Sequence, residues 1–132
     1  MKVIEKDGLV LAKHITPDDW SGGLSFFSSD EEFIQVGAWK YDSGKELRAH
    51  IHNEVERKVT RTCEALYIVS GGLHAMIYSL QEELIAELDA HAGDILILLN
   101  SGHGYQILED DTRVLEIKNG PYLGADADRR RI

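Results

Sequence analysis

The chain has 132 residues, a length typical of one compact domain, and 43% of them are hydrophobic, enough to bury a core. Its 23 acidic residues outnumber its 14 basic ones, and the net charge of −9 argues against nucleic acid and anionic membranes as partners. The single cysteine, Cys63, excludes an intrachain disulfide, and the first residues lack the continuous apolar run of a signal peptide. We therefore expect a cytoplasmic protein.

Short segments rich in β-branched and aromatic residues, separated by glycines and polar turns, predict an all-β domain. The predicted strands are residues 33–41, 46–52, 65–69, 73–78, 84–88, 95–99, 105–108 and 113–118. We expect 73–78 to form a hairpin with 84–88, and 105–108 to form one with 113–118. Residues 79–88 also have the leucine spacing of a helix, but the neighbouring strands favour the hairpin. This regular succession of short strands is typical of a sandwich or barrel.

The most informative residues for function are two histidines separated by one residue, His50 and His52. In an extended strand, residues i and i+2 point to the same face, so both imidazoles can approach one point. A third histidine, His103, and the carboxylate of Glu64 follow later in the chain. Imidazole and carboxylate groups that converge in this way predict a site for a divalent metal ion.

Two motifs of the chain resemble those of the cupin superfamily. The first is a glycine, five residues, His-x-His, and later a glutamate that six residues separate from another glycine: Gly44, His50, His52, Glu64 and Gly71. The second is a Gly-Asp pair, a hydrophobic run and a Gly-His-Gly-aromatic sequence: Gly93, Asp94, Gly102, His103, Gly104 and Tyr105. Together the motifs lie within residues 33–118, which is most of the chain.

The resemblance implies a double-stranded β-helix, which is a jelly-roll barrel, formed as a single domain. Its core would comprise about residues 33–118, with an N-terminal extension over 1–32 and a C-terminal tail over 119–132. It also implies a divalent metal ion (Fe, Mn, Ni, Zn or Cu) held by His50, His52, Glu64 and His103, with positions left for a ligand. Small cupins usually form homodimers, so a homodimer is expected.

The chain departs from the cupin pattern in ways that leave the carboxylate ligand open. Eleven residues, 53–63, separate His52 from Glu64, where the family usually has three or four. Glu56 stands at the usual distance from His52 and is the alternative ligand. We favour Glu64 because it begins a strand, where it would share a face with Leu66 and Ile68. In the second motif Leu99 replaces a common proline, His103 comes one residue early, and the closing asparagine is missing.

Several other residues are candidates for the site or for ordinary structural roles. Arg48 shares a face with the two histidines of its strand, so it would hold an anionic substrate group or lie at the barrel rim. Tyr105 would line the cavity and, like Glu64, move a proton, or it would be a core tyrosine. Cys63 is expected on the opposite face from Glu64 as a packed thiol. The remaining histidines are expected to be hydrogen-bonded structural residues: His14, His74 and His91.

Three functions remain open from the sequence. The first is a metal-dependent enzyme that isomerises, epimerises or dioxygenates a small sugar-like or carboxylate-like molecule. The second is a module that binds or senses a metal and a small ligand without turnover. The third resembles the cupin-type sugar-nucleotide isomerases, which would use histidine and tyrosine as acid and base without a metal.

Overall fold

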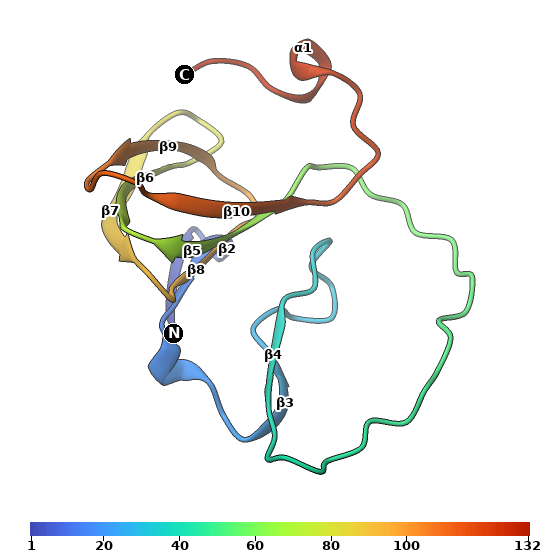
Figure 1. Ribbon diagram of the computed structural model, residues 1–132. Helices are drawn as coiled ribbons and strands as arrows, with labels where there is room; N and C mark the ends of the chain where they lie inside the picture. Colours follow the sequence, from blue (N-terminus) through green and yellow to red (C-terminus); the bar gives the residue numbers. More distant parts are fainter.

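A computed structural model describes all 132 residues, and nearly all of its regular elements are antiparallel strands (Figure 1). The strands are β1 Lys2–Lys6, β2 Leu9–Ile15, β3 Gly23–Phe26, β4 Gly37–Lys40, β5 Glu64–Ser70, β6 Gly72–Tyr78, β7 Leu84–His91, β8 Ile95–Leu98, β9 Gly102–Ile107 and β10 Arg113–Lys118. Two short helical turns, η1 Pro17–Asp19 and α1 Ala125–Asp128, complete the elements. No helix has the length and apolar character needed to cross a membrane. The all-β class predicted from the sequence is confirmed.

The strands form three sheets that do not close into a barrel. The largest has the order β1-β2-β8-β5-β10, the second has the order β7-β6-β9, and β3 pairs only with β4. The five-stranded and three-stranded sheets pack face to face, and the β3–β4 hairpin lies outside this pair, below the five-stranded sheet in Figure 1. The arrangement is therefore a two-sheet sandwich with an additional hairpin.

The main core lies between the two larger sheets. Alternate residues of β5 and β6 supply its centre, and Ile68, Ala75 and Ile77 are completely buried there. This alternation is the expected result when one face of each strand packs on the opposite sheet. Because Leu66 and Ile68 belong to this core, the face of β5 that begins with Glu64 is directed into the sandwich.

A second core covers the opposite face of the five-stranded sheet, beneath the β3–β4 hairpin. Ala38 of β4 packs there with Ile97 and with the buried Cys63. Burial raises the pKa of the Cys63 thiol. The prediction that Cys63 is a packed thiol on the face opposite Glu64 is therefore confirmed.

The predicted strand at residues 46–52 is wrong. Residues 41–61 are exposed along their whole length, and residues 46–62 make no backbone–backbone hydrogen bonds. The segment instead follows a wide arc away from the sheets between β4 and β5 (Figure 1). Leu47 and Ile51 alternate with polar residues as in a strand, but alternation makes a strand only where a neighbour pairs with the backbone.

The predicted hairpin of residues 105–108 with 113–118 is also wrong, although both strands exist. β9 pairs with β6, with Leu73 opposite Ile107, while β10 pairs with β5, with Glu64 opposite Lys118. The polar connection between the two strands therefore crosses from one sheet to the other. The hydroxyl of Thr112 anchors this crossing by hydrogen bonds with the backbone of Gly72.

The remaining strand predictions are accurate in the second half of the chain and incomplete in the first. The hairpin expected at 73–78 and 84–88 is present as β6 and β7, and no helix forms over 79–88. Of residues 33–41, only Gly37–Lys40 forms a strand. Residues 1–32, expected to lie outside the core, provide β1 and β2 of the largest sheet, and Leu11 is buried in the main core.

Candidate functional site

Glu64 is the central residue of the candidate site. It begins β5, and its side chain is only 9% exposed although it carries a carboxylate. Burying a carboxylate is costly unless partners compensate for the lost hydration. The residues around Glu64 therefore define what this end of the sandwich can do.

Lys118 compensates the charge of Glu64 from the neighbouring strand. It is the last residue of β10 and stands opposite Glu64 in the β5–β10 ladder. Its Nζ lies 2.8 Å from Oε1 of Glu64 and 3.1 Å from Oε1 of Glu116. The hydrogen bond to Glu64, with support from Glu116, raises the pKa of the Lys118 ammonium, so it remains charged.

His103 approaches the other oxygen of Glu64 from the opposite sheet. Its Nε2 lies 3.4 Å from Oε2 of Glu64, which accepts no hydrogen bond, and its Nδ1 is buried without a partner. Burial lowers the pKa of His103, an effect that the charge of Glu64 opposes in part. Burial thus favours the neutral imidazole, the form that ligates metals or accepts a proton.

Tyr105 follows on the same strand and stacks against His103, with ring centroids 5.3 Å apart. Its hydroxyl is buried and has no hydrogen-bond partner within the protein. Burial and, to a smaller extent, the charges of Glu64 and Glu116 raise the pKa of Tyr105 well above its usual range. The hydroxyl therefore stays protonated and is available as a donor. Ser101, two residues before His103, also has a buried hydroxyl without a partner.

The other residues predicted for the site lie elsewhere. Arg48, His50, His52 and the alternative ligand Glu56 are all exposed on the 41–63 segment, and Nδ1 of His50 lies 3.2 Å from the carbonyl oxygen of Arg48. The rings of His50 and His52 do lie together, with centroids 4.9 Å apart. No three His, Cys, Asp or Glu side chains, however, converge in a group that could hold a metal ion. The structure brings together Glu64, His103 and Tyr105 only.

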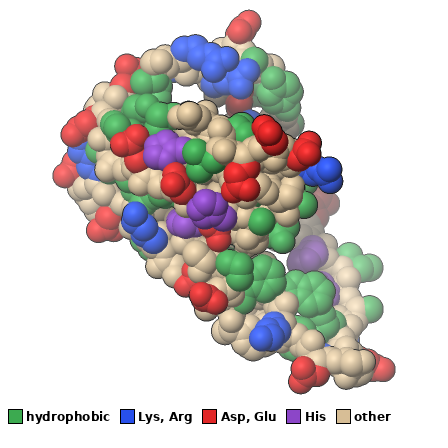
Figure 2. Space-filling view, turned by 60° about the vertical axis from the view of Figure 1, so that its left-hand side comes forward, with side chains coloured by type: hydrophobic (Ala, Val, Ile, Leu, Met, Phe, Trp, Pro, Cys, Tyr) green, Lys and Arg blue, Asp and Glu red, His purple; other side chains and the backbone are tan.

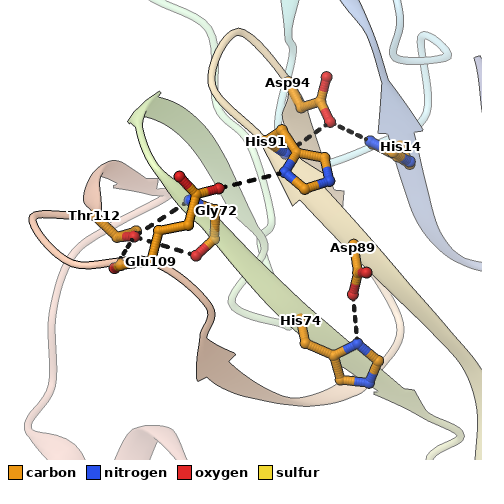
Figure 3. Close-up of polar contacts among 8 residues, drawn as sticks. All are labelled: His14, Gly72, His74, Asp89, His91, Asp94, Glu109 and Thr112. Carbon is orange, nitrogen blue, oxygen red and sulfur yellow. Dashed lines mark hydrogen bonds and ion pairs between the residues drawn. The ribbon is translucent and has the colours of Figure 1, made fainter.

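The three histidines expected to be structural are paired with carboxylates (Figure 3). Nε2 of His14 lies 2.8 Å from Oδ2 of Asp94, and the same oxygen accepts a hydrogen bond from the backbone N–H of His91. Nδ1 of His74 lies 2.6 Å from Oδ1 of Asp89, and Nδ1 of His91 lies 3.8 Å from Oε1 of Glu109. These pairs connect the strands and turns of the sandwich and lie outside the candidate site.

The Glu64–His103 pair fits part of a metal site. Ligand atoms bind a transition metal at about 2.0–2.2 Å, so two ligands of one ion lie about 3–3.5 Å apart. The separation of 3.4 Å between Oε2 of Glu64 and Nε2 of His103 is within that range. Two features fit less well: Lys118 already neutralises the carboxylate, and Nδ1 of His103 lacks the acceptor that usually orients a ligating imidazole. The pair therefore supplies two ligands, and a complete site needs others.

Lys118 is the residue that the sequence analysis missed. Strand alternation predicts that Val114, Glu116 and Lys118 share one face of their strand. That Lys118 stands opposite Glu64 could not be predicted, because it depends on the order of the strands in the sheet. Two surface hollows have no residue of the site in their lining: one lies beside Lys40, Tyr41 and Lys45, the other beside Lys6 and Leu80. The chemistry of the buried pair, rather than surface shape, identifies the site.

Comparison of the chain with family models, with curated proteins and with solved structures gave no match. The resemblance to cupins consequently rests on the two sequence motifs alone.

Proposed function

We propose that this protein is a small cupin-type metalloprotein that binds a divalent ion through Glu64 and His103. The observation that carries the proposal is the 3.4 Å approach of Nε2 of His103 to Oε2 of Glu64, a buried oxygen that has no hydrogen-bond partner. A carboxylate and a neutral imidazole are suitable ligands for Fe, Mn, Ni, Zn or Cu. We propose that the chain adopts the double-stranded β-helix implied by the cupin resemblance when the metal is bound.

His50 and His52 complete the proposed ligand set. They precede Glu64 by fourteen and twelve residues, and a fully extended chain spans about 3.3–3.6 Å per residue. The 53–63 segment is therefore long enough to bring both imidazoles to the end of the sandwich that contains Glu64. The unpaired backbone of residues 46–62 and the free edge of β10 allow the segment to dock there as a strand.

The proposed ligand or substrate is a small polar molecule. A bound divalent ion would polarise a carbonyl or hydroxyl group. Tyr105, protonated and without a partner, would donate a hydrogen bond to such a molecule, and Glu64 would hold or transfer a proton. Arg48 would bind an anionic group if the segment docks. Isomerisation, epimerisation or dioxygenation are the proposed reaction classes, with binding without turnover as the alternative.

Elemental analysis of purified variants tests the ligand assignment. We expect about one divalent ion per chain in the native protein, and a loss of most of it in Glu64→Gln and His103→Gln. His74→Gln is the matched control, because His74 is also a histidine beside carboxylates but lies outside the pair. Full metal content in both Glu64→Gln and His103→Gln would reject the assignment.

A second candidate function is a metal-free acid–base site, and the Lys118–Glu64 ion pair favours it. Lys118 supplies the positive charge that a metal would otherwise bring to the carboxylate. His103 and the stacked Tyr105 would then be the base and the acid, as in sugar-nucleotide isomerases of cupin type. Binding of a small sugar-like molecule distinguishes this candidate from the metalloprotein. In the metal-free site, binding would persist after the metal is removed by chelation and would decrease in Tyr105→Phe.

A further inference from the structure

The C-terminal tail returns to the end of the sandwich that contains Glu64 and His103. β10 ends at Lys118, beside Glu64, and the chain then continues through α1 to Ile132. In Figure 1 the tail leaves the end of β10, passes through α1 and turns back above β9. The tail therefore starts beside Glu64 of β5 and ends on the side of β9, the strand that carries His103.

One attachment of the tail lies beside Glu64. The hydroxyl of Thr62 donates a hydrogen bond of 2.5 Å to Oδ1 of Asp128. Thr62 precedes Glu64 by two residues, which places the Cα atoms of the two residues within about 7 Å of each other. The start of the tail is held there as well, because the backbone N–H of Cys63 donates to Oδ1 of Asn119 at 2.5 Å.

A second attachment lies beside His103. Arg130 forms an ion pair with Glu82 in the β6–β7 connection and donates to the carbonyl of Leu80 at 3.3 Å. The side chain of Ile132 occupies the space that a side chain on Gly102 would fill, and Gly102 is the residue before His103. Residues 128–132 thus connect a point next to Glu64 with a point next to His103.

We propose that residues 128–132, which we call the C-terminal strap, cross the end of the site and restrict it to ions and small ligands. Only the identity of the ligand, a divalent ion with a small molecule, rests on the proposed function. The side chains of Arg130 and Glu82 are 65% and 48% exposed, and ion pairs on the surface contribute little to stability. The strap can therefore open and close without unfolding the sandwich.

Chemical modification of His103 by diethylpyrocarbonate tests the strap in metal-stripped protein. His74 is an internal reference, since the His103 and His74 side chains are similarly exposed, at 27% and 28%. We expect His103 to react several-fold faster, relative to His74, in Arg130→Gln and in a chain ending at residue 128. Arg131→Gln, which changes the adjacent exposed arginine, should leave the ratio unchanged.

An unchanged His103 ratio in both Arg130→Gln and the shortened chain would overturn the strap. An equal rise of this ratio in Arg131→Gln would also overturn the strap, because the reactivity of His103 would then depend on the net charge of the tail and not on the Arg130 contact. Thermal unfolding of each variant identifies a folding defect, and the point variant keeps the test valid if the shortened chain does not fold. Because no metal is present, the outcome is independent of whether Glu64 and His103 bind one.

Discussion

Lys118 stabilises a carboxylate that would otherwise be buried without a counter-charge. Removing one partner of a buried ion pair leaves the other uncompensated, whereas removing both charges is often tolerated. We expect Lys118→Met to lower the free energy of unfolding by about 2 kcal/mol, less than a fully buried pair because Lys118 is 32% exposed. Chemical denaturation measures this loss. Lys118→Met combined with Glu64→Gln should recover most of it, and full additivity of the two losses would contradict the coupling.

His74 should make stability depend on pH. Hydrogen bonds to Asp89 and Glu87 raise its pKa above 6.5 in the folded chain. Protonated His74 therefore stabilises the fold below pH 6.5, and this contribution is lost as the pH rises through the raised pKa. The unfolding free energies of wild type and His74→Gln should differ at about pH 5.5 and converge at about pH 9. A difference that is independent of pH would exclude this role.

The turn between β7 and β8 depends on the conformation of Gly93. Its φ is +95°, a region that side chains rarely adopt, and a Cβ there would lie 2.9 Å from Cγ of Pro17. We expect Gly93→Ala to lower the unfolding free energy by about 1–3 kcal/mol. Gly22→Ala, where nothing lies within 4 Å of the added Cβ, is the matched control and should change it by less than about 0.5 kcal/mol. Equal melting temperatures for the two variants would contradict this account.

The strands of residues 64–118 were predictable from local sequence, whereas β1 to β3 were not predicted and most strand partners were not. Residues 65–69 of β5 and the whole of β8 are continuous apolar runs, and β10 was predicted at its observed bounds. The failure at 46–52 has a physical cause, because apolar alternation cannot report whether a backbone partner is available. β9 and β10 were assigned to one hairpin because they are adjacent in sequence, but each satisfies its hydrogen bonds in a different sheet.

The candidate site shows the same division between local and long-range information. Alternation along β5 correctly placed Glu64 on the core face and Cys63 on the other. The approach of His103 to Glu64 was expected from the motif resemblance, while the ion pair with Lys118 required the order of the strands. The residue types therefore indicated an imidazole–carboxylate site, and the strand order determined that Lys118 pairs with Glu64.

One large apolar surface of the whole molecule has no covering element. Leu24 lies opposite Trp39 on the outer face of the β3–β4 hairpin, with Phe26 and Tyr41 on the same side. Hydrophobic side chains gather on the lower part of the molecule in Figure 2, where the hairpin lies. These four residues expose on the order of 400 Å², the size of patch that often marks an interaction site.

We expect the homodimer predicted from the sequence to form through this hairpin face. Trp39 is 59% exposed at the centre of the face, so Trp39→Asp should convert the dimer to a monomer by placing an unpaired charge in the contact. Ile51→Asp is the control, because Ile51 is 94% exposed on the 41–63 segment, outside the face. Sedimentation velocity measures both. A wild-type monomer at high concentration would contradict the expectation.

The central claim is that Glu64 and His103 bind one divalent ion, and anomalous diffraction from crystals grown with Zn²⁺ tests it most directly. The predicted result is a peak within about 2.0–2.2 Å of both Oε2 of Glu64 and Nε2 of His103, with Lys118 displaced from the carboxylate. A zinc peak confined to His74 and its carboxylates, with the Glu64–His103 pair empty and Lys118 still in place, would contradict the claim.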